Sequence, residues 1–419
     1  MKLSQFNIKK EINGNIIIYN TLSSGILMLN PEYSRYYSTL EKNGFVDKSD
    51  LLSELKKGGM LINKDIDEIG ALNLESKFQR YSSESLSLTI APTLECNFAC
   101  PYCYEEGHRY SEMDENIQKD LINFLNNFPN IKNLNISWYG GEPLLKLNLL
   151  ESITKQILDK LSNVNFNANI VTNGYYLTKE NAIRLKNINV SHVQVTLDGN
   201  KETHDKRRIL LNGNGTFEKI LNNIKESCEI LPIVIRINVD KENITNIFSL
   251  IELLKEENLL NKVGFYLAPV DNSNNTCKSN TCFTIKDFSK EEISFYEKCL
   301  SLGVNSINIP KTTLGICGAI SKNSYVISPT GELYKCWNEI GRKEYSIGNL
   351  KDKLKANFRL TKWLQYDPLK EYPECTSCKF LPTCFGGCPY NYMQNIEKKC
   401  ISMLFNSEKT IELLYSLNK

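Results

Sequence analysis

The sequence is poor in histidine and has no long apolar run, and each shortage argues against a class of protein. Its 419 residues include only three histidines, His108, His192 and His204, which disfavours metal sites built from imidazole. No run of eighteen apolar residues occurs, so no transmembrane helix is expected. The start, MKLSQFNIKKEINGNIII, lacks the apolar core of a signal peptide. We therefore expect a soluble, cytoplasmic protein without a membrane partner.

An excess of charge of one sign is also missing. The 50 lysines and arginines almost balance the 48 aspartates and glutamates, for a net charge of +2. Binding to nucleic acid needs a basic footprint, so no nucleic-acid partner is predicted. Cysteine, in contrast, is abundant, with 14 residues. Because a reducing cytosol keeps thiols free, these cysteines indicate metal or redox chemistry rather than disulfides.

The chain is long enough for two or three domains. Residues 1–80 read as a small winged-helix-like unit, and residues 77–84 as a polar linker. The pattern predicts a hairpin of strands at 16–20 and 25–29, helices at 31–41 and 48–57, and a short strand at 60–62. This unit is either a recognition domain or a mere folding appendage.

From residue 85 to 310 the sequence predicts an α/β domain. Strand and helix patterns alternate, which indicates a parallel sheet covered by helices. The six predicted strands lie at 86–90, 134–139, 169–171, 192–197, 233–239 and 263–267. Six units are two fewer than a full barrel, so we expect an open, partial (β/α)6 TIM-like barrel. Its reacting groups should lie at the carboxyl ends of the strands.

Three cysteines follow the first predicted barrel strand with the spacing C-x3-C-x2-C, namely Cys96, Cys100 and Cys103. A closed zinc site needs four ligands, whereas three thiolates on a 4Fe-4S cluster leave one iron open for a group from outside the protein. The spacing by itself also fits half of a zinc site completed elsewhere, or three buried thiols.

The tail, residues 311–419, carries seven of the cysteines. With little periodic structure, it reads as a small domain held together by metal. The spacing is C-x13-G-x4-C, then C-x2-C-x5-C-x3-C, then one more cysteine: Cys317, Cys336, Cys375, Cys378, Cys384, Cys388 and Cys400. Taken alone, the tail is also compatible with a zinc ribbon.

Together, the three-cysteine loop, the motif Gly140-Gly141-Glu142-Pro143 and the tail resemble the radical S-adenosyl-L-methionine (SAM) enzymes with a C-terminal SPASM domain. The resemblance covers about residues 85–402. It implies three 4Fe-4S clusters, the first binding SAM through its open iron at Cys96, Cys100 and Cys103. One auxiliary cluster would use Cys375, Cys378, Cys384 and Cys400, and the other Cys317, Cys336 and Cys388. An electron donor such as flavodoxin or ferredoxin is then expected.

Several residues are candidates for contact with SAM. Gly140 and Gly141 would let the backbone approach its amino group, Glu142 offers a carboxylate for the same ammonium, and Pro143 completes the motif. A plain strand-to-helix turn is the alternative reading.

Further candidates lie in the cysteine loop and on later strands. Tyr102 would stack on the adenine or simply pack, and Arg236 and Asn238 share one face of a strand. Thr196 and Asp198 end another strand, as SAM contacts or as part of a solvated loop.

Two departures from the related anaerobic sulfatase-maturating enzymes bear on the product. Those enzymes carry an aspartate after the cysteine matching Cys336, and here Trp337 stands in that place. They also carry a further cysteine where this chain has Lys311. The cluster at Cys317, Cys336 and Cys388 would then keep an open iron, unless Cys277, Cys282 or Cys299 reaches it.

An open auxiliary iron would bind a substrate thiolate, as the resemblance to thioether-forming peptide maturases implies. The N-terminal unit resembles the leader-peptide recognition domain of such enzymes, whose hairpin edge takes up a leader as an added strand. We therefore predict a maturase that installs thioether crosslinks in a ribosomally made precursor peptide. Other radical crosslinking, sulfatase maturation and a non-catalytic zinc scaffold that binds peptides are the alternatives.

Overall fold

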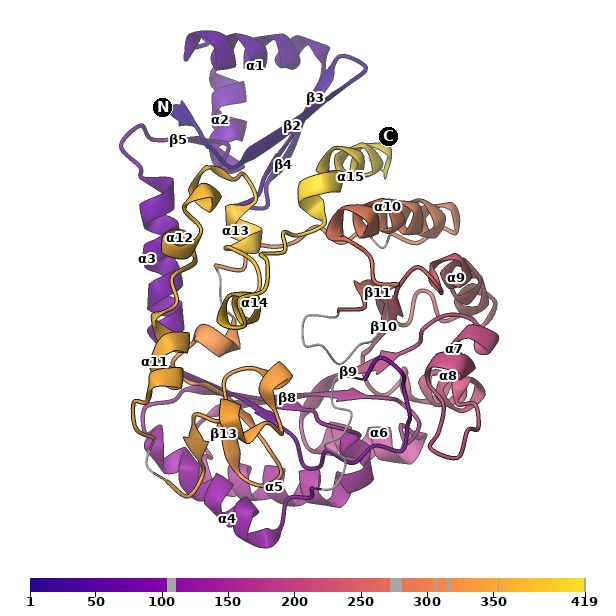
Figure 1. The fold of residues 1–419 in the computed structure, drawn as a ribbon. Coiled ribbons are helices and arrows are strands. Elements are labelled where there is room, and N and C mark those ends of the chain that lie inside the picture. Colours follow the sequence, from indigo (N-terminus) through magenta and orange to yellow (C-terminus); the bar gives the residue numbers. More distant parts are fainter. Residues whose placement is uncertain (104–110, 272–280, 306, 315–316, 353, 418–419) are drawn as a thin grey trace.

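The computed structural model describes residues 1–103, 111–271, 281–305, 307–314, 317–352 and 354–417. A sheet of nine strands organises this part of the chain, in the order β11-β10-β9-β8-β7-β6-β12-β13-β14 (Figure 1). Its six barrel strands all run parallel: β6 (Ser85–Ile90), β7 (Asn133–Trp138), β8 (Asn165–Thr172), β9 (Val190–Thr196), β10 (Ile233–Val239) and β11 (Gly264–Pro269). The predicted partial TIM-like barrel is confirmed.

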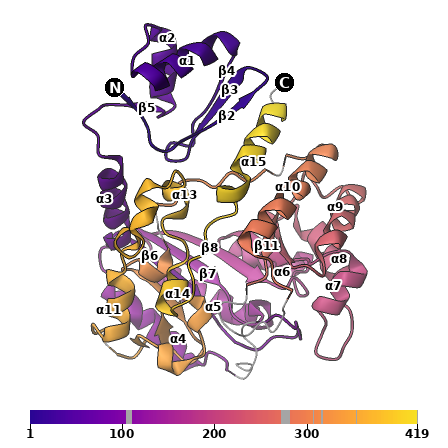
Figure 2. The same cartoon turned by 45° about the horizontal axis from the view of Figure 1, so that its top comes forward.

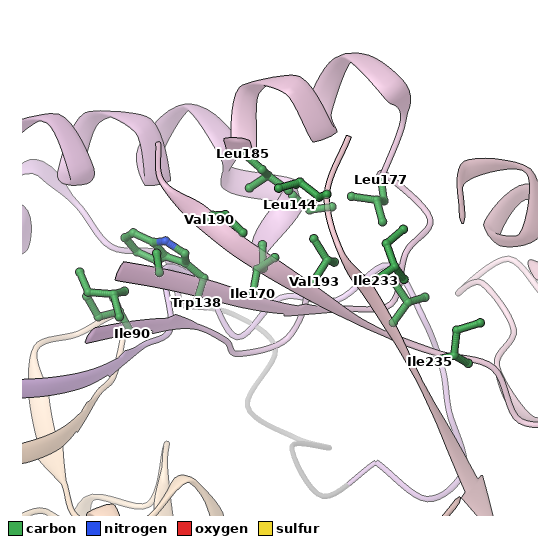
Figure 3. Close-up of a cluster of buried hydrophobic side chains, with 14 of the residues drawn as sticks. Ile90, Trp138, Leu144, Ile170, Leu177, Leu185, Val190, Val193, Ile233 and Ile235 are labelled. Carbon is green, nitrogen blue, oxygen red and sulfur yellow. The ribbon is translucent and has the colours of Figure 1, made fainter. Parts of the chain in front are cut away.

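Helices cover the outer face of the barrel sheet. They are α4 (Glu115–Phe124), α5 (Leu147–Lys160), α6 (Lys179–Asn187), α7 (Lys201–Arg207), α8 (Phe217–Ser227) and α9 (Ile247–Glu256), with 3-10 turns η1 (Leu125–Asn127), η2 (Pro143–Lys146) and η3 (Ile244–Asn246). Alternate strand residues such as Trp138, Ile170 and Val193 point toward these helices and are fully buried (Figure 3). The large apolar core therefore lies outside the barrel, which leaves the opposite face for polar groups.

The cysteine tail continues the barrel sheet. β12 (Ser324–Ile327) pairs in parallel with β6, so that Val326 lies opposite Thr89. β13 (Glu332–Tyr334) and β14 (Gly348–Asn349) add antiparallel strands. The sequence did not predict this pairing, because four- and three-residue strands carry too little periodicity to be recognised.

Short helices make up the rest of the tail. They are η4 (Gly318–Ile320), η5 (Trp337–Glu339), η6 (Lys343–Tyr345), α11 (Phe358–Gln365), α12 (Pro368–Glu371), η7 (Pro373–Ser377), α13 (Leu381–Cys384), α14 (Pro389–Met393) and α15 (Met403–Leu417). The last helix, α15, packs against α10 (Ile285–Ser301), where the Asn406 side chain donates to the Ser289 carbonyl at 3.0 Å (Figure 2). No helix in the described ranges is both long and apolar enough to span a bilayer.

The N-terminal unit contains the predicted hairpin within a larger antiparallel sheet. β3 (Asn15–Asn20) pairs with β4 (Ile26–Leu29) as predicted, and also with β2 (Asn7–Ile12), which the sequence did not reveal. Helices α1 (Pro31–Asn43) and α2 (Ser49–Lys57) cover one face, and β1 (Lys2–Leu3) pairs with β5 (Leu61–Ile62). The other face packs against α15 and the tail through residues such as Ile17 and Tyr19.

The expected linker at 77–84 is wrong, because most of it lies in helix α3 (Glu68–Tyr81). This helix runs alongside the tail in both views (Figures 1 and 2). Near its end, Arg80 is only 2% exposed. Its guanidinium donates to the carbonyls of Ile320, Leu364 and Tyr366 at 3.3, 3.3 and 2.7 Å. Although this stretch of sequence is polar, its Arg80 side chain joins the first unit to the tail.

Replacing Arg80 with Ala should destabilise the protein by about 2 to 4 kcal/mol, because three buried carbonyls lose a charged donor. A fall of several degrees in the thermal unfolding midpoint of the anaerobically purified protein would show this. The exposed Arg35 is the matched control, and Arg35→Ala should leave the midpoint nearly unchanged. Equal midpoints for the two variants would contradict the anchoring role.

Candidate active site

The three-cysteine loop crosses the carboxyl end of the barrel sheet and is pinned by the segment after α7. Ala99 N donates to the Ile209 carbonyl at 2.8 Å, and Leu211 N to the Asn97 carbonyl at 3.0 Å. Phe98 is buried between them and meets the Tyr175 ring edge-on. Because the backbone is held this way, the Cys96, Cys100 and Cys103 side chains stay partly exposed and available as ligands.

Cys96 lies in the most enclosed part of this loop. Burial raises the pKa of its thiol to about 12, with the nearby Glu142 carboxylate acting in the same direction. Its sulfur accepts from Phe98 N at 3.4 Å, and Asn173 Nδ2 lies 3.9 Å away. A thiol in such a place becomes a thiolate only when a bound cation compensates its charge, as a metal centre does.

Gly140 and Gly141 are needed for close packing against the cysteine loop. A Cβ on Gly140 would lie 2.4 Å from the Thr93 carbonyl oxygen, and one on Gly141 would lie 2.2 Å from that of Glu95. Gly140 also has φ +112°, which other residues rarely adopt. The two glycines therefore seat the end of β7 directly under the loop that carries the cysteines. Their predicted contact with SAM remains a prediction.

Glu142 is fully buried and ties two strand ends together. Its carboxylate accepts from Thr172 Oγ1 at 2.7 Å, Asn173 N at 2.7 Å and Leu144 N at 2.9 Å. Burial raises its pKa, while these hydrogen bonds oppose that shift. The sequence predicted a contact with the SAM ammonium but not this structural bridge. Pro143 occupies the first position of η2, where its missing N–H costs nothing.

Tyr102 and Asp198 meet in a network of buried charges. The Tyr102 hydroxyl donates to the Asp198 carboxylate and accepts from Arg208 Nη1 at 2.9 Å. The guanidinium of Arg207 lies 5.0 Å from the centre of the Tyr102 ring, and it also pairs with Asp240 at 2.9 Å. The cysteine loop is thereby locked to the end of β9. Helix α7 follows the end of β9 and carries Arg207 in its last turn.

Arg236 and Asn238 share a face of β10, as predicted, and contact each other. Arg236 Nε donates to Asn238 Oδ1 at 2.8 Å, and Arg236 Nη1 lies 3.5 Å from the Tyr266 hydroxyl. Asn238 N also donates to Asp198 at 3.2 Å, while Thr196 stands beside Arg236 in the sheet register. No carboxylate pairs with Arg236 in the described residues, which leaves its charge for an anionic ligand.

Buried nitrogen atoms without partners provide a test of whether a ligand fits here. In the part of the chain that the structure describes, Asn97 Nδ2, Arg207 Nη2 and Arg208 Nε have no hydrogen-bond partner. Asn97 belongs to the cysteine loop itself, and Arg207 and Arg208 lie over the Tyr102 and Phe98 rings of that loop. Buried donors are nearly always satisfied in complete proteins, so these atoms fit a site that receives a polar, anionic group.

The grouping of the tail cysteines stays a prediction, but several of them lie near one another. Burial, together with neighbouring Cys400, Cys375 and Cys378, raises the pKa of the Cys384 thiol to about 11. Burial, with smaller effects of Cys317 and Cys388, also raises the pKa of the Cys336 thiol. Cys388 is the exposed member of the tail set.

Of the possible extra ligands to the second group, Cys299 is fully buried in the barrel core, Cys282 stands just before α10, and Cys277 lies outside the described residues.

Two cations lie near Cys317, and in the described ranges neither has a carboxylate within salt-bridge distance. Lys335 is 2% exposed, and its ammonium donates to the Ser321 and Ser324 carbonyls at 2.6 and 2.5 Å. Desolvation lowers its pKa to about 7, and Cys317 opposes that shift. The Arg80 guanidinium lowers the pKa of the Cys317 thiol, against the larger upward effect of burial. Buried cations beside a thiolate set favour an anionic centre there.

Three thiolates suit an iron-sulfur cluster, which can keep one iron without a protein ligand, better than a closed zinc site, which needs four ligands. Cys96, Cys100 and Cys103 would hold the first such group.

Comparisons with known proteins agree with this geometry. Residues 90–254 match the model of the radical SAM superfamily. The cysteine-type anaerobic sulfatase-maturating enzyme of Clostridium novyi is 26% identical over 352 residues, which cover 74% of this chain and 90% of that protein. The Fe-coproporphyrin III synthase of Methanosarcina barkeri is 30% identical over 177 residues, or 42% of either chain.

Two solved structures share the fold. Native anSMEcpe with bound AdoMet and the Cp18Cys peptide aligns with a TM-score of 0.61 at 20% identity, over 80% of this chain and 99% of that chain. Streptococcus suis SuiB bound to the precursor peptide SuiA aligns with a TM-score of 0.55 at 14% identity, over 96% and 98%. Coverage of 96% leaves too few residues out to omit the N-terminal unit, so SuiB shares that unit's fold.

Replacing Arg236 with Leu should raise the dissociation constant for SAM about tenfold to a hundredfold, because the barrel loses an unpaired cation for the SAM carboxylate. Equilibrium binding of labelled SAM to the reconstituted protein measures this directly. Arg184, which pairs with Glu151 on the barrel surface, serves as the control, and Arg184→Leu should bind SAM normally. Unchanged affinity in Arg236→Leu would exclude the contact.

Proposed function

The chain is a radical SAM enzyme with SAM and an iron-sulfur cluster as cofactors. We propose that it installs thioether crosslinks in a ribosomally made precursor peptide. We also propose the division into a peptide-recognition unit at 1–80, a barrel at 85–310 and an auxiliary-cluster domain at 311–419. The observation that carries the thioether proposal is the second thiolate set. Cys317 and Cys388 both lie near enough to Cys336 to raise its pKa, and Cys388 is exposed, which supports a set of three ligands open to a substrate.

The chemistry needs a carbon radical and a sulfur atom at one place. When bound, the first cluster and SAM supply a 5′-deoxyadenosyl radical that takes a hydrogen atom from an unactivated carbon. Cys317, Cys336 and Cys388 would supply three thiolates, and a substrate cysteine would complete the set. Per crosslink the peptide loses a hydrogen atom to deoxyadenosine, the proton of the thiol and one electron, which a cluster held by Cys317, Cys336 and Cys388 would accept. An external donor such as flavodoxin or ferredoxin supplies the starting electron.

The edge of β4 is our proposed docking strand for the leader of the precursor. Asn20 N donates to the Gly25 carbonyl at 2.9 Å, so by alternation the peptide groups of Ile26 and Met28 point away from β3. In the described residues no strand pairs with that edge. Its sequence, ILML, is apolar and lacks the charges that usually protect an edge strand. The opposite edge, β2, carries Lys9, Lys10 and Glu11 instead.

A cavity of about 320 Å³ lies beside the turn that leads into β4. Helix α3, β5 and the turn itself line it with mostly apolar side chains, among them Leu22, Ile62, Ile66, Ala71, Leu72 and Leu314. An extended peptide on the β4 edge could place an apolar side chain there. SuiB, which shares the fold of this unit, was solved with its precursor peptide bound, which supports a peptide substrate here.

Sulfatase maturation is the second candidate, since the relative from Clostridium novyi is a sulfatase-maturating enzyme. Trp337, in the place where such enzymes carry an aspartate, argues against it. Radical crosslinking of carbon to carbon or oxygen fits the same barrel and differs in the product alone. The match to the radical SAM model removes the support for a non-catalytic zinc scaffold.

Replacing Cys100 with Ala should abolish formation of 5′-deoxyadenosine while leaving precursor binding largely intact, because the first cluster loses a ligand. Iron should fall from about twelve to about eight atoms per chain after reconstitution. The substrates to test are synthetic peptides encoded by short, cysteine-containing reading frames beside the gene. Wild-type enzyme should remove two hydrogens per crosslink, and a Cys→Ser peptide should not be crosslinked. Crosslinking of that serine peptide would contradict the thioether product.

Replacing Ile26 with Pro should weaken leader binding about tenfold, because proline removes an outward N–H donor without breaking the bonds from β4 to β3. Fluorescence anisotropy of a labelled leader peptide gives the affinity. Glu11→Pro on β2 is the matched control, since by the same alternation Glu11 also points its peptide group away from β3. If Glu11→Pro weakens binding and Ile26→Pro does not, the leader docks on the other edge.

A further inference from the structure

One of the three tryptophans is placed where water reaches it. Trp138 and Trp363 are buried in the barrel and the tail, at 0% and 1% exposure. Trp337 is 51% exposed. A tryptophan gains more from burial than almost any other side chain, so an exposed indole at a defined position forgoes a large stabilisation. The fold and the proposed thioether chemistry leave this residue unexplained.

Trp337 lies next to a cysteine of the tail and close to the barrel motif that begins at Gly140. It follows Cys336 directly, and its ring centre lies 6.3 Å from that of Tyr139, with the ring planes tilted by 31°. Tyr139 comes directly before Gly140, which packs against the cysteine loop. We call Trp337 and Tyr139 the aromatic pair. One ring comes from the tail and the other from the barrel, so the pair spans the boundary between them.

The backbone that carries Trp337 is rigid. It begins η5, where Glu339 N donates to the Cys336 carbonyl at 3.1 Å. Glu339 is fully buried and forms an ion pair with Arg359, whose guanidinium lies 4.2 Å from the centre of the Tyr345 ring. These contacts fix the backbone from which the indole projects, and the Tyr139 ring lies beside the indole. A fixed apolar surface is what a binding site requires, whereas a mobile one would lose entropy on binding.

We propose that the aromatic pair binds an apolar or aromatic side chain of the precursor next to the residue that loses hydrogen, and so positions the reacting carbon between the two cysteine sites. This inference rests on the proposed function. The aromatic pair is continuous with the candidate site, because Tyr139 adjoins the motif at Gly140 and Trp337 adjoins Cys336. The substrate of that site is therefore the expected occupant. The two tilted rings offer flat apolar faces, which suit contact with an apolar or aromatic side chain and not the recognition of a carboxylate.

Positioning has a measurable signature that separates it from a structural role. Trp337→Ala should raise the KM for the precursor about fivefold or more and raise the ratio of 5′-deoxyadenosine to crosslinked peptide, because a misplaced carbon is not attacked before the radical is lost. Trp337→Phe keeps an aromatic face and should retain most of the coupling. SAM affinity and iron content should match the wild type in both variants.

Phe358→Ala is the matched control, since Phe358 is an aromatic residue of the tail that is 85% exposed and lies outside the aromatic pair. The occupant is identified by changing each apolar residue of the precursor to Ala in turn. At one position the effect of the alanine should shrink about fivefold or more in Trp337→Ala relative to wild type, as expected for groups in contact.

The inference is overturned if wild-type enzyme crosslinks the precursor but Trp337→Ala keeps its KM and coupling ratio, or if Phe358→Ala changes them equally. It is also overturned if no precursor position couples to Trp337. Failure of the proposed function looks different, because wild-type enzyme would then crosslink no cysteine-containing precursor at all.

Discussion

The pairing of β12 with β6 is the contact on which the rest of the site depends. Through it, the sheet of the barrel runs without a break into the cysteine tail. Backbone hydrogen bonds between strands fix distance and register together. Cys96, Cys100 and Cys103 follow β6, while Cys336 follows β13, two strands away. The cysteines of the barrel loop and Cys336 of the tail are thereby carried by one continuous sheet.

Charge is the second constraint. Cys96 and Cys336 are partly buried, and burial raises the pKa of both thiols. Cations without carboxylate partners at salt-bridge distance in the described ranges lie in the same regions: half-buried Arg236 in the barrel, and buried Lys335 and Arg80 beside the tail cysteines. Buried charges are costly unless an opposite charge lies nearby, so both regions favour anionic ligands.

The barrel could be predicted from the sequence almost completely. Each of its six strands has six to eight residues with apolar or aromatic side chains among them, and a helix follows most of them. The errors fall where the local signal is weak or misleading. The end of helix α3 was predicted as part of a linker because its sequence is polar, although Arg80 is buried. β2 carries three consecutive charged residues and was missed, and β12 to β14 are too short to show any period.

The spacing of the cysteines indicated metal or redox chemistry, because closely spaced thiols are natural metal ligands. The assignment of individual cysteines to separate clusters came from the family resemblance and stays a prediction. Only the tertiary structure decided the rest. Glu142 bridges two strand ends, Tyr102 is tied to Asp198 and Arg208, and Trp337 of the tail meets Tyr139 of the barrel. These partners are from about 30 to almost 200 residues apart in the sequence. No local pattern can reveal contacts that exist only after β6 has paired with both of its neighbours.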